Sequence, residues 1–121
     1  MKTILVTDDD ETCRESIQRV LEREGYDVET APDADSALEA LHARSFDLLV
    51  CDYRMPRKTG LELLEELRRQ YPQLPVLMIS ACADSVTKAA ALYLGAFDFL
   101  MKPIRKQELV DRAAKATHVN R

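Results

Sequence analysis

Short apolar runs alternate along this chain with longer segments in which apolar residues recur every three or four positions. Five runs have strand length and lie at residues 4–6, 28–30, 46–52, 76–80 and 97–101. The segment after each run has helical spacing. Because parallel strands need crossover connections, this alternation predicts an α/β fold with a five-stranded parallel sheet and helices on both faces.

Polar residues and glycines mark the ends of the predicted helices. Thr59 and Glu62 match a capping box, in which each side chain accepts a bond from the other residue's backbone N–H. Asp84 or Ser85 is expected to cap the next helix, and Gly25 and Gly95 predict helix ends. The helical side chains expected to face the core are Cys13, Ile17, Val20, Leu21, Ala37, Leu38, Leu41, Leu63, Leu64, Leu67, Leu109, Val110, Ala113 and Ala114.

The composition predicts one domain over residues 1–121. A hydrophobic content of 46% in 121 residues is enough to fill one core. The net charge of -4 comes from charges of both signs spread along the chain, without the basic stripe that nucleic-acid binding requires. The apolar runs are far shorter than the roughly 18 residues of a membrane span. We therefore expect a soluble cytoplasmic domain that contacts neither nucleic acid nor membrane.

The cysteines and histidines do not predict a metal or redox site. Cys13, Cys51 and Cys82 lack the spacing of a metal or redox motif, and His42 and His118 are isolated. Free cysteine packs as a small apolar residue, so we expect buried or partly buried reduced thiols.

Asp52 is the candidate reacting residue. It ends an apolar run and precedes a turn that contains Pro56 and Gly60. In an open parallel sheet, ligands bind in the crevice beyond the carboxyl ends of the strands. The other predicted strands bring Asp8, Asp9, Ser80 and Lys102 to the same edge.

These side chains suit phosphoryl transfer. Clustered carboxylates repel one another and need a cation, and Mg²⁺ takes one or two carboxylates together with phosphate oxygens. A carboxylate can attack phosphorus to form an aspartyl phosphate. The Lys102 ammonium can neutralise one phosphate oxygen and the Ser80 hydroxyl can bond another.

The chain resembles the receiver domain of two-component response regulators over almost its whole length. The stretches that carry the resemblance lie at residues 6–10, 51–56 with Gly60, 79–81 and 95–103. The resemblance implies a doubly wound, flavodoxin-like sheet in the order 2-1-3-4-5. It also implies that the peptide bond between Lys102 and Pro103 is cis.

The resemblance assigns roles to individual residues. It implies that Asp52 is the phosphoacceptor and that Mg²⁺ is held by Asp8, Asp9, Asp52 and the backbone carbonyl of Arg54. It further implies that the Ser80 hydroxyl and the Lys102 ammonium act on the phosphoryl group. Ser80 and Phe99 would form the pair of residues that moves in the switch. In this family the residues at the positions of Arg54 and Cys82 tune the lifetime of the phosphate. An ordinary core aromatic explains Phe99 almost as well.

The residues alone do not decide which two of the first three aspartates form the acidic pair. Three consecutive aspartates allow the acidic pair to be Asp8 with Asp9 or Asp9 with Asp10. We favour the first pair because it directly follows the apolar run. Asp10 then fits the start of a helix, where acidic side chains are favoured.

The resemblance implies a signalling switch rather than an enzyme. Its expected partners are a sensor histidine kinase or histidine phosphotransfer protein, and a downstream effector or output domain, with phosphorylation-dependent homodimerisation as a further expectation. The alternatives are an unphosphorylated interaction module and a Mg²⁺-dependent aspartyl-phosphate phosphohydrolase. The hydrolase needs a second carboxylate two residues after its nucleophile, where this chain has Arg54. We expect no output domain within these residues, so the chain is either a free-standing receiver or part of a larger protein.

Overall fold

The computed structural model describes residues 1–81 and 84–119. Within them, strands and helices alternate from the first element to the last. The strands are β1 (Thr3–Thr7), β2 (Asp27–Ala31), β3 (Leu48–Asp52), β4 (Val76–Ser80) and β5 (Asp98–Met101), and the helices are α1 (Glu11–Arg23), α2 (Ala34–Ala43), α3 (Gly60–Gln70), α4 (Ser85–Tyr93) and α5 (Lys106–Val119).

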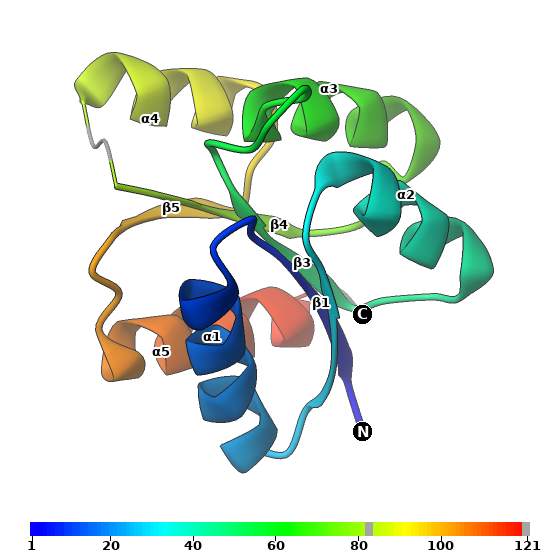
Figure 1. Ribbon diagram of the computed structural model, residues 1–121, viewed down its shortest axis with the longest axis vertical. Helices are drawn as coiled ribbons and strands as arrows, with labels where there is room; N and C mark the ends of the chain where they lie inside the picture. The colour runs from blue at the N-terminus through cyan, green and yellow to red at the C-terminus, as the bar shows by residue number, and fades with distance from the viewer. Residues whose placement is uncertain (82–83, 120–121) are drawn as a thin grey trace.

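The sheet has the order β2-β1-β3-β4-β5, and every neighbouring pair is parallel. Helices α1 and α5 cover one face, and α2, α3 and α4 cover the other (Figure 1). The predicted doubly wound α/β fold is therefore confirmed, with β3 at the centre of the sheet.

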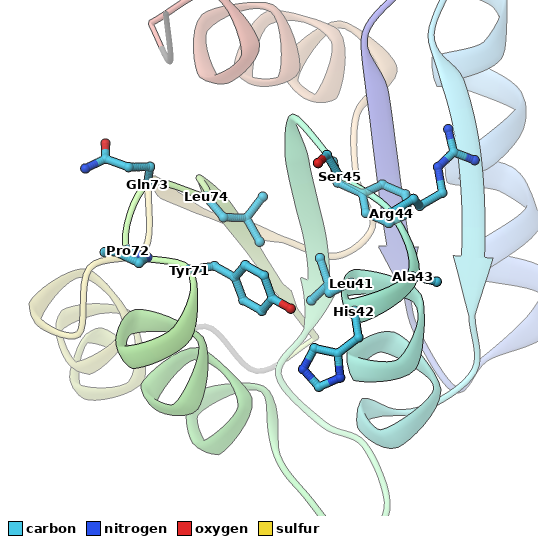
Figure 2. A pocket seen from close by; sticks show the side chains of 10 residues that line it. Leu41, His42, Ala43, Arg44, Ser45, Tyr71, Pro72, Gln73 and Leu74 are labelled. Carbon is cyan, nitrogen blue, oxygen red and sulfur yellow. The ribbon is translucent and has the colours of Figure 1, made fainter.

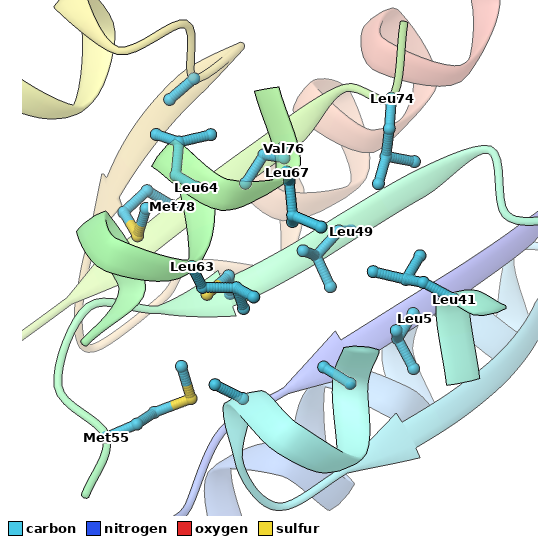
Figure 3. Packing of buried hydrophobic residues seen from close by; sticks show 14 of the residues in the cluster. Leu5, Leu41, Leu49, Met55, Leu63, Leu64, Leu67, Leu74, Val76 and Met78 are labelled. Carbon is cyan, nitrogen blue, oxygen red and sulfur yellow. The ribbon is translucent and has the colours of Figure 1, made fainter. Parts of the chain in front are cut away.

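Two hydrophobic clusters fill the space between the sheet and its helices. Because side chains alternate along a strand, Leu49 points toward α2, α3 and α4, whereas its neighbours Leu48 and Val50 point toward α1 and α5. Figure 3 shows the first cluster, in which Leu63, Leu64 and Leu67 of α3 pack against the sheet. All residues of β3 and β4 are buried, which explains why their sequences are almost continuously apolar.

The predicted stripe on α5 is partly wrong. Leu109, Ala113 and Ala116 are buried, whereas Ala114 is exposed and Val110 is only partly buried. The spacing of the buried residues follows one helix face, and Ala114 lies one position beyond it.

Side-chain caps fix the starts of four described helices, and at α2 the Asp33 side chain accepts a bond from the Ser36 N–H. The capping box of Thr59 and Glu62 is present at α3. Asp84 caps α4 by accepting a bond from the Thr87 N–H, and Asp10 caps α1. These caps set the direction in which each helix leaves the carboxyl edge of the sheet.

Gly60 is required by close packing at the start of α3. A Cβ atom at this position would lie 2.6 Å from the Asp52 carbonyl oxygen and 2.8 Å from the Met78 sulfur. The Gly60 N–H also donates to the Tyr53 carbonyl oxygen at 2.8 Å. The turn therefore folds tightly against the last residue of β3, whose side chain is the candidate phosphoacceptor.

Arg57 in the same turn has a φ of 70°, a conformation that favours glycine. Its ion pair with Asp33 is long, at 3.4 Å, and its side chain is 68% exposed, so the pair contributes little stability. We predict that Arg57→Gly raises the free energy of unfolding by about 0.5–1 kcal/mol in urea titrations. Arg57→Ala removes the same ion pair but keeps the strain, so a gain in this control would contradict the explanation.

Strand β2 lies at one edge of the sheet, and only Val28 and Ala31 of its residues are buried. Arg44, which follows α2, forms ion pairs with Asp27 at 3.0 Å and with Glu29 at 3.1 Å. Its guanidinium also lies 5.3 Å from the centre of the Phe46 ring. One arginine therefore joins the edge strand to the loop before β3.

Three smaller predictions have different outcomes. The peptide bond between Lys102 and Pro103 is cis, as predicted. Cys13 and Cys51 are free, partly buried and buried respectively, whereas Cys82 lies outside the described residues. In the part of the chain that the structure describes, no helix combines the length and apolar character needed to cross a bilayer.

Candidate functional site

The carboxyl edge of the sheet gathers the predicted polar residues. Asp52 and Ser80 are the last residues of β3 and β4, and Asp8 and Lys102 directly follow β1 and β5. The parallel register places these four ends at one edge. Ser80 and Asp8 are completely buried and Asp52 is 4% exposed, so the groups are largely screened from water.

Asp8, Asp9 and Asp52 form a compact carboxylate cluster. One oxygen from each lies within 4.8 Å of the other two. Asp10 points elsewhere, since its side chain accepts bonds from the Thr12 and Cys13 N–H groups at the start of α1. The structure thus groups Asp52 with the preferred acidic pair, and the third aspartate is a helix cap.

Lys102 bridges the two buried carboxylates. Its Nζ lies 3.0 Å from Oδ2 of Asp8 and 3.2 Å from Oδ2 of Asp52. Burial alone would lower the pKa of Lys102, but the hydrogen bond to Asp8 and the charge of Asp52 outweigh it and raise the pKa. The ammonium is therefore charged throughout the physiological range and partly neutralises the cluster.

The two buried carboxylates have opposite pKa shifts. Burial and the negative charge of Asp8 raise the pKa of Asp52 to about 6, against the lowering influence of Lys102. Burial also opposes ionisation of Asp8. However, hydrogen bonds from the Asp10 N–H, the Cys13 thiol and Lys102 overcome it and hold the pKa of Asp8 below its ordinary value. Asp8 is thus a stable anion, whereas Asp52 carries a charge that its surroundings disfavour.

Two cavities differ in their relation to this cluster. The smaller, of about 460 Å³, is lined by Asp9, Tyr53, Arg54, Met55, Pro56 and Thr59 and therefore adjoins the carboxylates. The larger, of about 580 Å³, lies between the C-terminal ends of α2 and α3, where Leu41, His42, Tyr71 and Leu74 line it (Figure 2). Its lining residues come before β3 and β4, at the opposite edge of the sheet from Asp52. Position and chemistry both favour the smaller cavity as the functional site.

Comparison with known proteins identifies the family. A family model described as the response regulator receiver domain matches residues 4–114. The chain belongs to the response regulator receiver domain family. Receiver domains are phosphoacceptor switches of two-component systems.

Named relatives of this receiver domain are longer proteins. The alkaline phosphatase synthesis transcriptional regulatory protein PhoP of Bacillus subtilis is 40% identical over 108 residues, covering 89% of this chain and 45% of that protein. The response regulator MprA of Mycobacterium ulcerans is 46% identical over 110 residues, covering 90% of this chain and 47% of that protein. The chain thus spans less than half the length of these two relatives.

Solved structures of receiver domains have the same fold. A CheY-like receiver domain protein of Methanospirillum hungatei superposes with a TM-score of 0.94 at 30% identity, covering 99% of this chain and 96% of that one. The receiver domain of NtrX from Brucella abortus gives a TM-score of 0.91 at 39% identity, covering 95% and 98%.

Two predicted residues of the receiver site lie at its margin. The Arg54 N–H donates to Oδ1 of Asp52 at 3.3 Å, so its backbone approaches the acceptor, while its side chain is exposed. Phe99 is 6% exposed and packs with the cluster beneath α3 and α4. This burial suits a core aromatic as well as the inward state of a switch.

A contact from Arg14 to Asp8 was not predicted from the sequence. Nη1 of Arg14 donates to the Asp8 carbonyl oxygen at 2.7 Å. The sequence carried one signal for this contact, because Arg14 lies on the first turn of a helix that follows the acidic pair after only one residue.

Proposed function

We propose that Asp52 accepts a phosphoryl group from a histidine kinase or histidine phosphotransfer protein in a Mg²⁺-dependent reaction. The observation that carries the proposal is the buried Asp52 carboxylate, clustered with Asp8 and Asp9 and paired with Lys102. In the transfer, an Asp52 oxygen bonds to phosphorus as the bond from phosphorus to the donor's imidazole nitrogen breaks, and the imidazole leaves.

The donor set fits Mg²⁺. Three carboxylates offer only oxygen ligands, and their crowding is expressed in the raised pKa of Asp52. We propose Asp8, Asp9, Asp52 and the Arg54 backbone carbonyl as the residues that hold the ion. When bound, the ion neutralises negative charge on the transferring phosphoryl group.

The remaining residues act on the phosphoryl oxygens. The Lys102 ammonium, already 3.2 Å from Asp52, stabilises one oxygen by charge. The buried Ser80 hydroxyl at the end of the neighbouring strand donates to another. Asp8 stays ionised and fixes Lys102 from the other side, which keeps the ammonium beside the acceptor.

Phosphorylation would then change the surface formed by α4, β5 and α5. In the proposed switch, Ser80 moves toward the phosphate and Phe99 occupies the space beneath it. In this structure Phe99 is already buried. Shifting a two-state balance from 1:99 to 99:1 takes about 5.5 kcal/mol. Two or three charge-assisted hydrogen bonds of about 1.5–3 kcal/mol each supply that amount.

We propose that residues 1–121 act as one cytoplasmic receiver domain that assists only its own phosphorylation and dephosphorylation. Its output goes to an effector or attached output domain, through a changed interaction surface or a phosphorylation-dependent homodimer. The domain itself contacts neither nucleic acid nor membrane. Similarity to PhoP and MprA, which are named as regulatory proteins, supports a role upstream of such an output.

The experiment is phosphorylation by a small phosphodonor in the presence of Mg²⁺, followed by intact-mass measurement. We expect the wild type and an Asp111→Asn control, altered on the exposed surface of α5, to gain one phosphoryl group, and Asp52→Asn to gain none. A wild type that stays unmodified would overturn the proposal in favour of an interaction module. Continuous release of phosphate from added phosphoesters would overturn it in favour of a phosphohydrolase.

A further inference from the structure

The first turn of α1 holds the main chain of Asp8. Nη1 of Arg14 donates to the Asp8 carbonyl oxygen at 2.7 Å. We infer that Arg14 is a positioning residue that fixes Asp8 for metal binding. The inference rests on the proposed function, because it concerns the same Mg²⁺ site.

The junction between β1 and α1 is a closed hydrogen-bond network. The Asp10 N–H donates to Oδ1 of Asp8 at 2.9 Å, which ties the carboxylate to the residue that caps α1. The Asp10 side chain in turn accepts bonds from the N–H groups of Thr12 and Cys13. The cap therefore fixes the turn of helix from which Arg14 reaches back to Asp8.

Arg14 acts on the main chain of Asp8 and not on its carboxylate. Its bond to the carbonyl oxygen restrains the peptide that joins the buried Asp8 to the exposed Asp9. Both side chains belong to the carboxylate cluster, so rotation of this peptide would separate their oxygens. Arg14 thus sets the relative orientation of the two acidic groups.

The Asp8 carboxylate has its own restraints. The Asp10 N–H donates to Oδ1 at 2.9 Å and Lys102 Nζ donates to Oδ2 at 3.0 Å, and these two bonds limit rotation of the side chain. Asp8 is therefore set in place before the ion arrives, whereas Asp9 is exposed and can adjust to it.

Arg14→Met tests the inference because the two possible roles of Arg14 predict opposite changes in Mg²⁺ affinity. Arg14 could position Asp8, or it could act only as a nearby positive charge. Loss of an outer-shell partner that orients a ligand weakens metal affinity by about 10- to 100-fold, and we expect the lower end of this range in Mg²⁺ titration calorimetry. Loss of a nearby positive charge alone would tighten Mg²⁺ binding. Arg19→Met, at an exposed arginine of the same helix, removes the same charge without touching Asp8 and should keep wild-type affinity.

Phosphorylation supplies an independent readout. We expect Arg14→Met to raise the Mg²⁺ concentration for half-maximal phosphorylation about tenfold while the rate at saturating Mg²⁺ stays near that of the wild type. Wild-type or tighter Mg²⁺ affinity in Arg14→Met would overturn the inference. Mg²⁺ binding by the wild type without phosphorylation would instead refute the proposed function, without contradicting the role of Arg14 in Mg²⁺ binding.

Arg14→Gln provides a second variant should Arg14→Met fail to fold. Its amide group is uncharged and stands on a shorter side chain than the guanidinium that donates to Asp8, so we expect a similar loss of Mg²⁺ affinity, about tenfold. Wild-type or tighter Mg²⁺ affinity in Arg14→Gln would equally overturn the inference.

Discussion

Lys102→Met destabilises the metal-free domain by about 3–5 kcal/mol at pH 7, the usual cost of removing one partner from a buried ion pair. The reason is that Nζ of Lys102 serves two buried carboxylates at once, at 3.0 Å from Asp8 and 3.2 Å from Asp52. Without the ammonium, two neighbouring anions remain in a site that excludes water. Urea unfolding in the presence of a chelator measures the loss.

Two comparisons separate this explanation from a general effect of charge. Lys88→Met on the exposed surface of α4 removes the same charge and should change stability by less than about 0.5 kcal/mol. Millimolar Mg²⁺ should restore much of the stability of Lys102→Met, since a cation then replaces the ammonium. Equal stability of Lys102→Met and wild type in chelator would show that Lys102 does not neutralise the cluster.

Asp52→Asn stabilises the metal-free domain, and the gain depends on pH. The folded domain raises the pKa of Asp52 from the ordinary 3.8 to about 6. One pKa unit corresponds to about 1.4 kcal/mol, so ionised Asp52 costs the folded state about 3 kcal/mol above pH 6. As the pH falls from 6 to 4, the folded carboxyl binds a proton before the unfolded one does, and the cost disappears. The asparagine variant avoids the charge throughout.

Urea unfolding of wild type and Asp52→Asn at pH 8, 6 and 4, with chelator present, measures this dependence. The stability difference should be about 3 kcal/mol at pH 8 and close to zero at pH 4. Asp111→Asn, at an exposed carboxylate on α5, should show no such trend. Saturating Mg²⁺ should reduce or reverse the difference at pH 8, because only the wild type has the full set of carboxylates. If the stability difference between wild type and Asp52→Asn were the same at all three pH values, the charge of Asp52 would not be what destabilises the folded state.

The sequence was sufficient for the fold because each local signal agreed with the architecture. Strands β3 and β4 are buried on both faces, which requires continuous apolar runs, and β2 is half-polar because it lies at an edge. Asp52 could be placed at the site because every strand of a parallel sheet ends at the same edge. The caps at Thr59 and Asp84 have short-range signatures that depend on neighbouring residues only.

Other features depend on distances that the sequence does not contain. Lys102 and Asp8 are 94 residues apart, and their contact depends on how β5 and β1 sit on either side of β3 and β4. The contact from Arg14 depends on the direction in which α1 leaves the sheet, which the Asp10 cap determines. Whether Asp8 or Asp10 joined Asp9 in the cluster was likewise decided by that cap. Ala114 shows that one residue of helical rotation is enough to misplace a core position.

The ion pairs of Arg44 have a consequence for the edge strand β2. An unprotected edge offers free backbone groups to which another polypeptide can add as a further strand, and this is a common route to cross-β aggregates. Here Asp27 and Glu29 put charge on that edge, and Arg44 holds both of them. A newly arriving strand would have to break these contacts and desolvate the charges. We expect the domain to remain dispersed at high concentration, and Arg44→Ala to increase light scattering in concentrated samples.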